Sequence, residues 1–172
     1  MGKFEDALRF VLSAEGGYTD NKNDRGGATN KGVTQAAYDK WRTAQMSPLS
    51  DVKWITDGEV ALLYRDYYWE PAHCDILDAP VSTMHFDSAV QHGVGRAIRF
   101  LQEACGVYMD GRWGAITAGA ALNMTHAQAK AYLDARRNFY DEIIQHDPSQ
   151  AVFARGWTNR ADQIQKILDE NR

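Results

Sequence analysis

The stretch that decides the fold is KFEDALRFVLSAEGGY, residues 3–18. Its apolar residues recur at spacings of three and four, which predicts an amphipathic helix over residues 3–14. Gly16 and Gly17 end that helix, so Glu15 stands where the helix stops and a glycine pair begins. A carboxyl group at the end of a rigid element can project into whatever the next loop encloses, and this position suits a catalytic acid.

The segment after this helix is polar and contains Gly26 and Gly27, so residues 18–31 are expected to form an ordered loop or a small hairpin. Thr34 then caps a helix that runs to about Arg42.

Further helices are predicted along the rest of the chain. Capping boxes at residues 56–59 and 125–128 open two of them, the first ending at Pro71 and the second reaching Gln145. Two more lie on either side of residues 93–95, a short one follows Thr117, and a closing helix starts at Thr158. No segment sustains the period-two alternation of strands, so the predicted fold class is all-α.

The chain shows no internal repeat and no linker rich in glycine, serine or proline. Its 172 residues suit one compact body of ordinary size. We expect two helical lobes, residues 1–80 and 81–172, that meet at a soft boundary near Pro80.

Charge and composition exclude several classes of function. A formal net charge of −4 gives no long-range attraction to nucleic acid. Cys74 and Cys105 are expected to be free thiols rather than a bridge. The first twenty residues hold neither a secretory signal nor a membrane span, so we expect synthesis in the cytoplasm and no membrane insertion.

Metal and nucleophile chemistry is not indicated either. The spacing of His73, Cys74, His85 and His92 matches no closed zinc pattern, and no cofactor is expected. The chain has no Gly-x-Ser-x-Gly turn and no cysteine protease signature, which disfavours attack on a peptide bond.

Glycoside hydrolysis needs a protonated carboxylic acid and usually a second carboxylate. Glu15 and Asp24 are the natural pair in this sequence. Leu12, Tyr18 and the aromatic residues of the helix after residue 56 are expected to shield Glu15 from water and favour its neutral form. The alternative from composition alone is that Glu15 is a solvated charge at a helix end.

The motif Glu15-Gly16-Gly17-Tyr18, followed by DRGGATNKGVT at residues 24–34, resembles the opening signature of glycoside hydrolase family 108. The resemblance continues through residues 67–69 and 86–93. It ends in a second block, Leu101-Gln102 with residues 110–117, which is similar to the peptidoglycan-binding segment of that family.

Members of this family are N-acetylmuramidases of phage endolysins and prophages, with related enzymes in toxin export. The resemblance implies a lysozyme-like fold and makes Glu15 the proton donor that cleaves the β-1,4 bond between N-acetylmuramic acid and N-acetylglucosamine. Asp24 is expected to position or deprotonate water with help from Thr29, which gives inversion at the anomeric carbon. The rival reading is that Asp24 only supports its loop; Thr29 stands one residue nearer to the glutamate than the corresponding threonine of phage-type lysozymes.

Several residues are expected to contact the glycan. Tyr18 and Trp69 offer aromatic faces for sugar rings, while Tyr64 and Tyr67 are assigned mainly to packing. Candidate hydrogen-bond partners for acetamido groups are Gln35, Asp87 and Gln91.

Two other functions remain open: a lytic transglycosylase, which makes a 1,6-anhydro product, and a peptidoglycan-binding module without catalysis. The expected partner is the peptidoglycan glycan strand, and nothing demands more than a monomer. Because the substrate lies outside the cytoplasm, a holin or another export route is implied.

Overall fold

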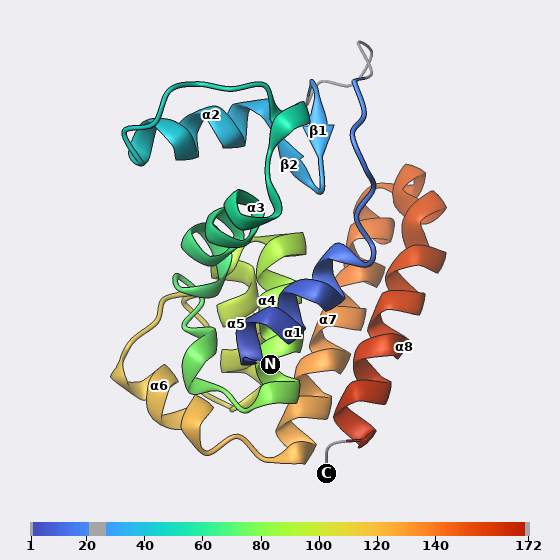
Figure 1. Cartoon of the computed structure of the whole chain (residues 1–172). Helices are drawn as coiled ribbons and strands as arrows, with labels where there is room; N and C mark the ends of the chain where they lie inside the picture. Colours follow the sequence, from blue (N-terminus) through green and yellow to red (C-terminus); the bar gives the residue numbers. More distant parts are fainter. Residues whose placement is uncertain (1, 21–26, 171–172) are drawn as a thin grey trace. The chain divides into compact units, whose positions relative to one another are not determined.

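The computed structural model describes residues 2–20 and 27–170. These residues form two compact units, one ending at Tyr67 and the other beginning at Tyr68. The two units therefore divide after Tyr67, whereas the sequence predicted a lobe boundary near Pro80. The expected all-α class with a small hairpin after the first helix is confirmed (Figure 1).

The first unit contains helix α1 (Lys3–Leu12), the hairpin strands β1 (Thr29–Asn30) and β2 (Val33–Thr34), and helix α2 (Gln35–Ala44). A 3-10 helix η1 (Val52–Trp54) and helix α3 (Asp57–Tyr64) complete it, and the π-helical segment η2 (Arg65–Trp69) leads into the second unit. The apolar stripe of α1 is buried as predicted, at Phe4, Ala7, Leu8 and Val11.

Both predicted helix caps in this unit are present. The Thr34 hydroxyl accepts the Ala37 backbone N–H at 3.2 Å at the start of α2. Thr56 and Glu59 form the reciprocal capping box of α3. These short-range interactions fix where each helix begins, which is why sequence alone located both starts.

The hairpin turns tightly over two residues. Thr29 pairs with Thr34 and Asn30 with Val33, which leaves Lys31 and Gly32 as the turn. Their φ angles are 51° and 76°, the pair of positive values that defines a type I′ turn. Gly32 adopts this geometry at little cost because it has no Cβ.

The second unit is built from longer helices. It contains η3 (Cys74–Ile76), α4 (Ala79–His92), α5 (Val94–Ala104), α6 (Ala115–Leu122), α7 (His126–His146), η4 (Pro148–Phe153) and α8 (Ala154–Glu170). Helices α4, α5, α7 and α8 pack against one another around a core that includes Leu101, Tyr132, Leu133 and Ile164. Figure 1 shows α7 and α8 running side by side.

Two predicted boundaries in this unit are wrong. Helix α8 begins at Ala154 rather than Thr158, because Asp147 caps a 3-10 helix through the Ser149 N–H and that helix leads directly into α8. Helix α6 begins at Ala115, before Thr117. The predicted split between α4 and α5 is confirmed at Gly93, whose φ is 83°.

The two cysteines are free thiols, as expected. Among residues 2–20 and 27–170, no helix combines the length and the apolar composition needed to cross a bilayer.

Two histidines of the second unit, the buried His85 and the half-buried His92, are expected to make it sensitive to acid. His85 bonds the Tyr132 hydroxyl and the Ala72 carbonyl, and burial lowers its pKa to about 4. Burial and the nearby Arg136 also lower the pKa of His92 to about 4. An unfolded histidine takes up its proton near pH 6.5, so between about pH 6.5 and 4 the unfolded chain binds more protons than the folded one.

We therefore expect stability to fall as the pH drops through this window, by about 2 kcal/mol for each histidine between pH 7 and 5. Urea unfolding at the two pH values measures the effect. A His92→Leu variant should lose part of this pH dependence, whereas His146→Gln, which changes an exposed histidine, should keep it. Equal stability of the wild type at both pH values would contradict the expectation.

Candidate functional site

The carboxyl group of Glu15 lies against the turn of the hairpin. A Cβ atom built on Gly32 would lie 2.9 Å from Glu15 Oε2 and 3.0 Å from Glu15 Cδ, and it would clash with the Tyr64 hydroxyl. Glu15 is half-buried, and its backbone N–H bonds the Leu12 carbonyl at the end of α1. The glutamate is thus held by α1 and directed at the backbone of a glycine that has no room for a side chain.

The turn is fixed to α3 at two points. The Tyr64 hydroxyl donates to the Lys31 carbonyl at 3.1 Å, and the Lys31 ammonium pairs with Asp57 at the start of α3. Tyr64 is buried, so its ring anchors the turn in the core of the unit. As a result, Glu15, Gly32 and Tyr64 meet although they are separated by up to 49 positions in sequence.

The base of the hairpin is fixed to the segment before α3. The Asn30 amide donates to the carbonyls of Val52 at 3.2 Å and Lys53 at 3.1 Å. The Gln35 amide donates to the Ser50 carbonyl at 2.8 Å and accepts the Val52 N–H at 2.7 Å. Gln35, predicted to bind an acetamido group, therefore uses its amide to position the chain around η1.

Thr29 joins the two ends of the loop that precedes the hairpin. Its backbone exchanges two hydrogen bonds of 2.8 Å with Thr19, and its hydroxyl faces the Gly27 carbonyl at 3.5 Å. The predicted partner Asp24 lies outside the described residues. Thr29 thus closes the loop that carries Asp24 in the sequence.

Tyr18 is exposed, with 39% of its surface accessible, and it follows Glu15 by three residues. The ammonium of Lys53 lies 5.6 Å from the centre of the Tyr18 ring. Of the aromatic residues predicted to stack on sugar, Tyr18 is therefore accessible from solvent in the same unit as Glu15.

Trp69 belongs to the second unit and is buried, with 1% of its surface accessible. Its indole N–H donates to Asp75 at 2.9 Å, and its ring packs edge-on against Phe86. This burial argues against the predicted contact with a sugar ring, since the face of the indole is covered by the core. Trp69 is accordingly left out of the candidate site.

Asp87 and Gln91 are part of a polar network inside the second unit. Asp87 is fully buried, and its carboxylate pairs with Arg136 of α7 at 2.7 Å and with Arg160 of α8. Burial alone would lower the pKa of Arg136, but the Asp87 carboxylate outweighs this and raises it. Gln91 accepts from Arg136 at 2.8 Å.

This network corrects the prediction for Asp87, because a carboxylate enclosed by two guanidinium groups has no face left for a substrate. Gln91 is exposed, but its amide oxygen is occupied by Arg136 and by the Tyr140 hydroxyl at 3.1 Å. Both residues hold helices of the second unit together.

The second sequence motif is organised around the buried Gln102. Its amide donates to Asp110 at 2.8 Å, to the Arg112 carbonyl at 3.1 Å and to the Thr117 hydroxyl at 3.1 Å, and it accepts the Gly111 N–H at 2.9 Å. Residues 110–114 of this motif therefore form a loop around Gln102, and Thr117 contacts the same glutamine from the first turn of α6. The loop lines a hollow of about 380 Å³ with Tyr108, Trp113 and Ile116.

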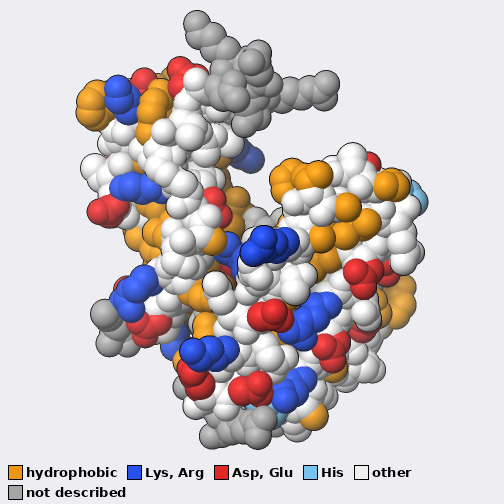
Figure 2. Space-filling view, turned by 90° about the vertical axis from the view of Figure 1, so that its right-hand side faces the viewer, with side chains coloured by type: hydrophobic (Ala, Val, Ile, Leu, Met, Phe, Trp, Pro, Cys, Tyr) orange, Lys and Arg blue, Asp and Glu red, His pale blue; other side chains and the backbone are white. Residues whose placement is uncertain are grey.

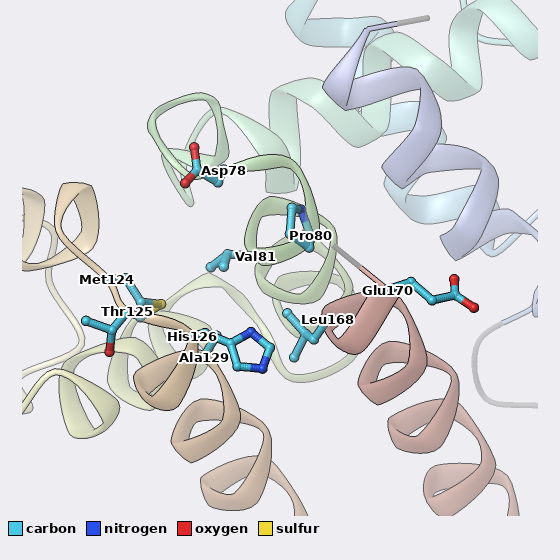
Figure 3. A pocket seen from close by; sticks show the side chains of 9 residues that line it. All are labelled: Asp78, Pro80, Val81, Met124, Thr125, His126, Ala129, Leu168 and Glu170. Atoms are coloured by element: carbon cyan, nitrogen blue, oxygen red, sulfur yellow. The ribbon is translucent and has the colours of Figure 1, made fainter. Parts of the chain in front are cut away.

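A second hollow, of about 620 Å³, lies where α4, α7 and α8 meet in the second unit. Figure 3 shows Asp78 and Glu170 on opposite sides of an apolar floor that includes Val81 and Leu168. Glycosidases with two catalytic carboxyl groups place both at one bond. Asp78 and Glu170 instead lie on opposite sides of the hollow, so the hollow is a poor candidate for the catalytic centre.

Sequence reasoning missed four residues of the site: Gly32, Tyr64, Asn30 and Lys53. The glycine of Asn30-Lys31-Gly32 is a turn signal that could have located the hairpin turn, but no local pattern indicates its contact with Glu15. Tyr64 was assigned to packing, and its ring is indeed buried, but its hydroxyl also bonds the turn.

We expect Gly32→Ala to abolish most activity, because its Cβ would displace the Glu15 carboxyl group and the Tyr64 hydroxyl. The positive φ adds a backbone cost of about 1–2 kcal/mol. Gly27→Ala is a matched control, since Gly27 has a φ of 68° but no atom of residues 2–20 or 27–170 within 4 Å of its Cβ position. Both variants should lose similar backbone stability, but only Gly32→Ala should lose most of its turnover of cell-wall substrate; equal turnover in the two would contradict the contact.

Two family models match successive parts of the chain, and they meet between residues 93 and 96, within the second unit. The family model described as Glycosyl hydrolase 108 matches residues 8–93, which include Glu15, Gly32 and Tyr64. The model described as Predicted Peptidoglycan domain matches residues 96–162, which include Gln102 and its loop.

The structure of SagA from Brucella abortus is 32% identical in sequence and superposes with a TM-score of 0.78. The match covers 97% of this chain and 94% of SagA. No curated protein sequence matches closely enough to add to these findings.

Proposed function

This chain belongs to the glycosyl hydrolase 108 family, and on that premise we propose that it is an N-acetylmuramidase with Glu15 as its general acid. Its two family matches make it a glycoside hydrolase that acts on peptidoglycan. The proposed reaction is hydrolysis of the β-1,4 bond between N-acetylmuramic acid and N-acetylglucosamine.

The placement of Glu15 carries this proposal. A general acid must sit at a fixed position so that its proton reaches the leaving oxygen in the transition state. Glu15 is held at the end of α1, half-buried, with Gly32 and Tyr64 against its carboxyl group. A solvated helix-end charge, the alternative reading of the sequence, would not require a glycine beside it.

For the second carboxylate we keep the proposal made from the sequence. Asp24 positions or deprotonates the attacking water with help from Thr29, and the product has the inverted configuration. Thr29 pairs with Thr19 through its backbone and belongs to the hairpin whose turn contacts Glu15, which supports a role for Thr29 in the reaction. In the rival proposal, Asp24 only stabilises that loop.

The proposal extends to the biological setting. The enzyme acts as a monomer of the endolysin type, of phage or prophage origin or from a secretion locus. It is made in the cytoplasm and reaches the wall through a holin or another export route. The segment at residues 96–162 holds the enzyme on the peptidoglycan strand.

Analysis of the products tests the proposed reaction. Purified sacculi digested with the wild type should release muropeptides with a new reducing end at N-acetylmuramic acid, because hydrolysis adds one water across the bond. Mass spectrometry after borohydride reduction identifies this end. The same digestion with Glu15→Gln should release none.

The same experiment separates the two alternatives. A lytic transglycosylase releases 1,6-anhydro products that are one water lighter and are not reduced by borohydride. A binding module without catalysis releases nothing, even though the wild type and Glu15→Gln both sediment with sacculi. Either result would overturn the proposed hydrolysis.

A further inference from the structure

An exposed cluster of two aromatic rings and one cation lies in the unit that holds Glu15. We name it the Lys53 cluster: Tyr18, Lys53 and Trp54. The Lys53 ammonium lies 5.6 Å from the centre of the Tyr18 ring and 5.2 Å from that of the Trp54 ring. Trp54 is 69% accessible and Tyr18 39%, so both rings face solvent.

This exposure is imposed by the fold around it. Val52 and Ile55, which flank Lys53 and Trp54 in the sequence, are buried in the core. The chain between them therefore directs Lys53 and Trp54 outward. The Asn30 amide donates to the Lys53 carbonyl at 3.1 Å, which ties this segment to the hairpin. The cluster is therefore held in place by the same hairpin that contacts Glu15.

The cluster also lies within reach of the proposed catalytic acid. Tyr18 follows Glu15 by three residues, and three residues of fully extended chain span at most about 11 Å. A disaccharide unit of the glycan covers a similar length. A sugar ring stacked on Tyr18 or Trp54 would therefore lie one or two sugars away from the glycosidic bond that is cleaved.

The charge of the cluster selects the ligand. Lys53 has no carboxylate partner within ion-pair distance among residues 2–20 and 27–170, and the Asp51 carboxylate accepts the Lys53 backbone N–H at 2.8 Å. Two aromatic faces suit pyranose rings, and the ammonium between them suits an anion. Of the two sugars in peptidoglycan, only N-acetylmuramic acid carries a side arm with carboxylates.

From this arrangement we infer that the Lys53 cluster is a glycan subsite that binds N-acetylmuramic acid through a carboxylate of its side arm. This inference rests on the proposed function. The carboxylate is that of the lactyl group where the stem peptide has been removed, or one of the stem peptide where it is present. In both cases Lys53 supplies the ion pair and the rings of Tyr18 and Trp54 bind the sugar.

Binding measurements in the Glu15→Gln background test the inference without turnover. The ligands are soluble glycan strands with stem peptides, strands stripped of peptides by an amidase, and chitin oligosaccharides, which have no carboxylate. Lys53→Gln should weaken binding of a carboxylate-bearing strand roughly three- to fivefold. It should leave chitin binding unchanged, and its effect should shrink at high salt because exposed charges are screened.

Trp54→Ala should weaken binding of all three ligands by roughly tenfold, since stacking does not depend on the carboxylate. Lys40→Gln and Leu49→Ala are matched controls: each changes an exposed side chain of the same unit and should leave binding unchanged. A Lys53→Gln effect on stripped strands alone identifies the lactyl carboxylate, and one on peptide-bearing strands alone identifies a stem carboxylate.

The inference fails if Lys53→Gln and Trp54→Ala bind all strands as tightly as the parent. It also fails if Lys53→Gln weakens chitin binding as much as strand binding. Failure of the proposed function is seen separately, as a wild type that releases no reducing ends from sacculi. Melting temperatures confirm that each variant is folded.

Discussion

Glu15→Gln is expected to reduce hydrolysis of peptidoglycan by about 10²–10⁴-fold, the usual contribution of general acid catalysis. The amide keeps the shape of the side chain and its position beside Gly32 and Tyr64, but it has no proton of suitable acidity to give the leaving oxygen. Release of reducing ends from purified sacculi measures the loss. Binding to sacculi should persist, because the change removes one proton and no contact surface.

The control for this prediction lies on the same helix. Glu5→Gln alters an exposed carboxyl group of α1 that has a long ion pair with Arg65. It should keep wild-type turnover, and both variants should unfold near the wild-type temperature. Full turnover by Glu15→Gln would exclude Glu15 as the acid, and unfolding of Glu15→Gln would reassign it to a structural role.

The largest effect on stability is expected at Asp87. Its buried carboxylate neutralises Arg136 and Arg160, which come from two different helices. Asp87→Asn leaves both cations without a counter-charge, and breaking a buried pair in this way costs about 3–5 kcal/mol. For a chain of this size the unfolding temperature should fall by roughly 10 °C.

An exposed ion pair of the same helices provides the control. Arg137 of α7 pairs with Asp162 of α8 at 3.1 Å, and both side chains are in contact with solvent. Asp162→Asn should therefore cost less than about 1 kcal/mol. Adding Arg160→Met to Asp87→Asn should recover part of the loss, since it removes one unpaired cation; equal stability of Asp87→Asn and Asp162→Asn would contradict the buried network.

These two residues show how far sequence reasoning reached. Glu15 could be proposed as the acid because its signals are local: an amphipathic stripe, a glycine pair and a family motif that lie within a few residues of one another. Asp87 was misassigned, because its partners stand 49 and 73 positions away and no local pattern marks them. A buried carboxylate and a substrate-binding one look alike in a sequence.

The same distinction applies to the fold. The all-α class and the starts of α2, α3 and α7 followed from periodicity and caps, which depend on neighbours within one helical turn. The division into two units after Tyr67 could not be predicted in the same way, because it depends on which distant segments of the chain pack together.

By itself, then, the sequence determined the all-α class, the capped starts of α2, α3 and α7, the family and the candidate acid, since each of these depends on residues close together in the chain. Only the tertiary structure decided what surrounds Glu15, which aromatic rings are exposed, and which polar residues are buried. The exposure and the contacts of these side chains are set when segments far apart in the sequence pack together, and the order of residues in the chain does not show which segments will meet. The exposed Trp54 and the buried Trp69 are the same residue type, and packing alone gives them different environments.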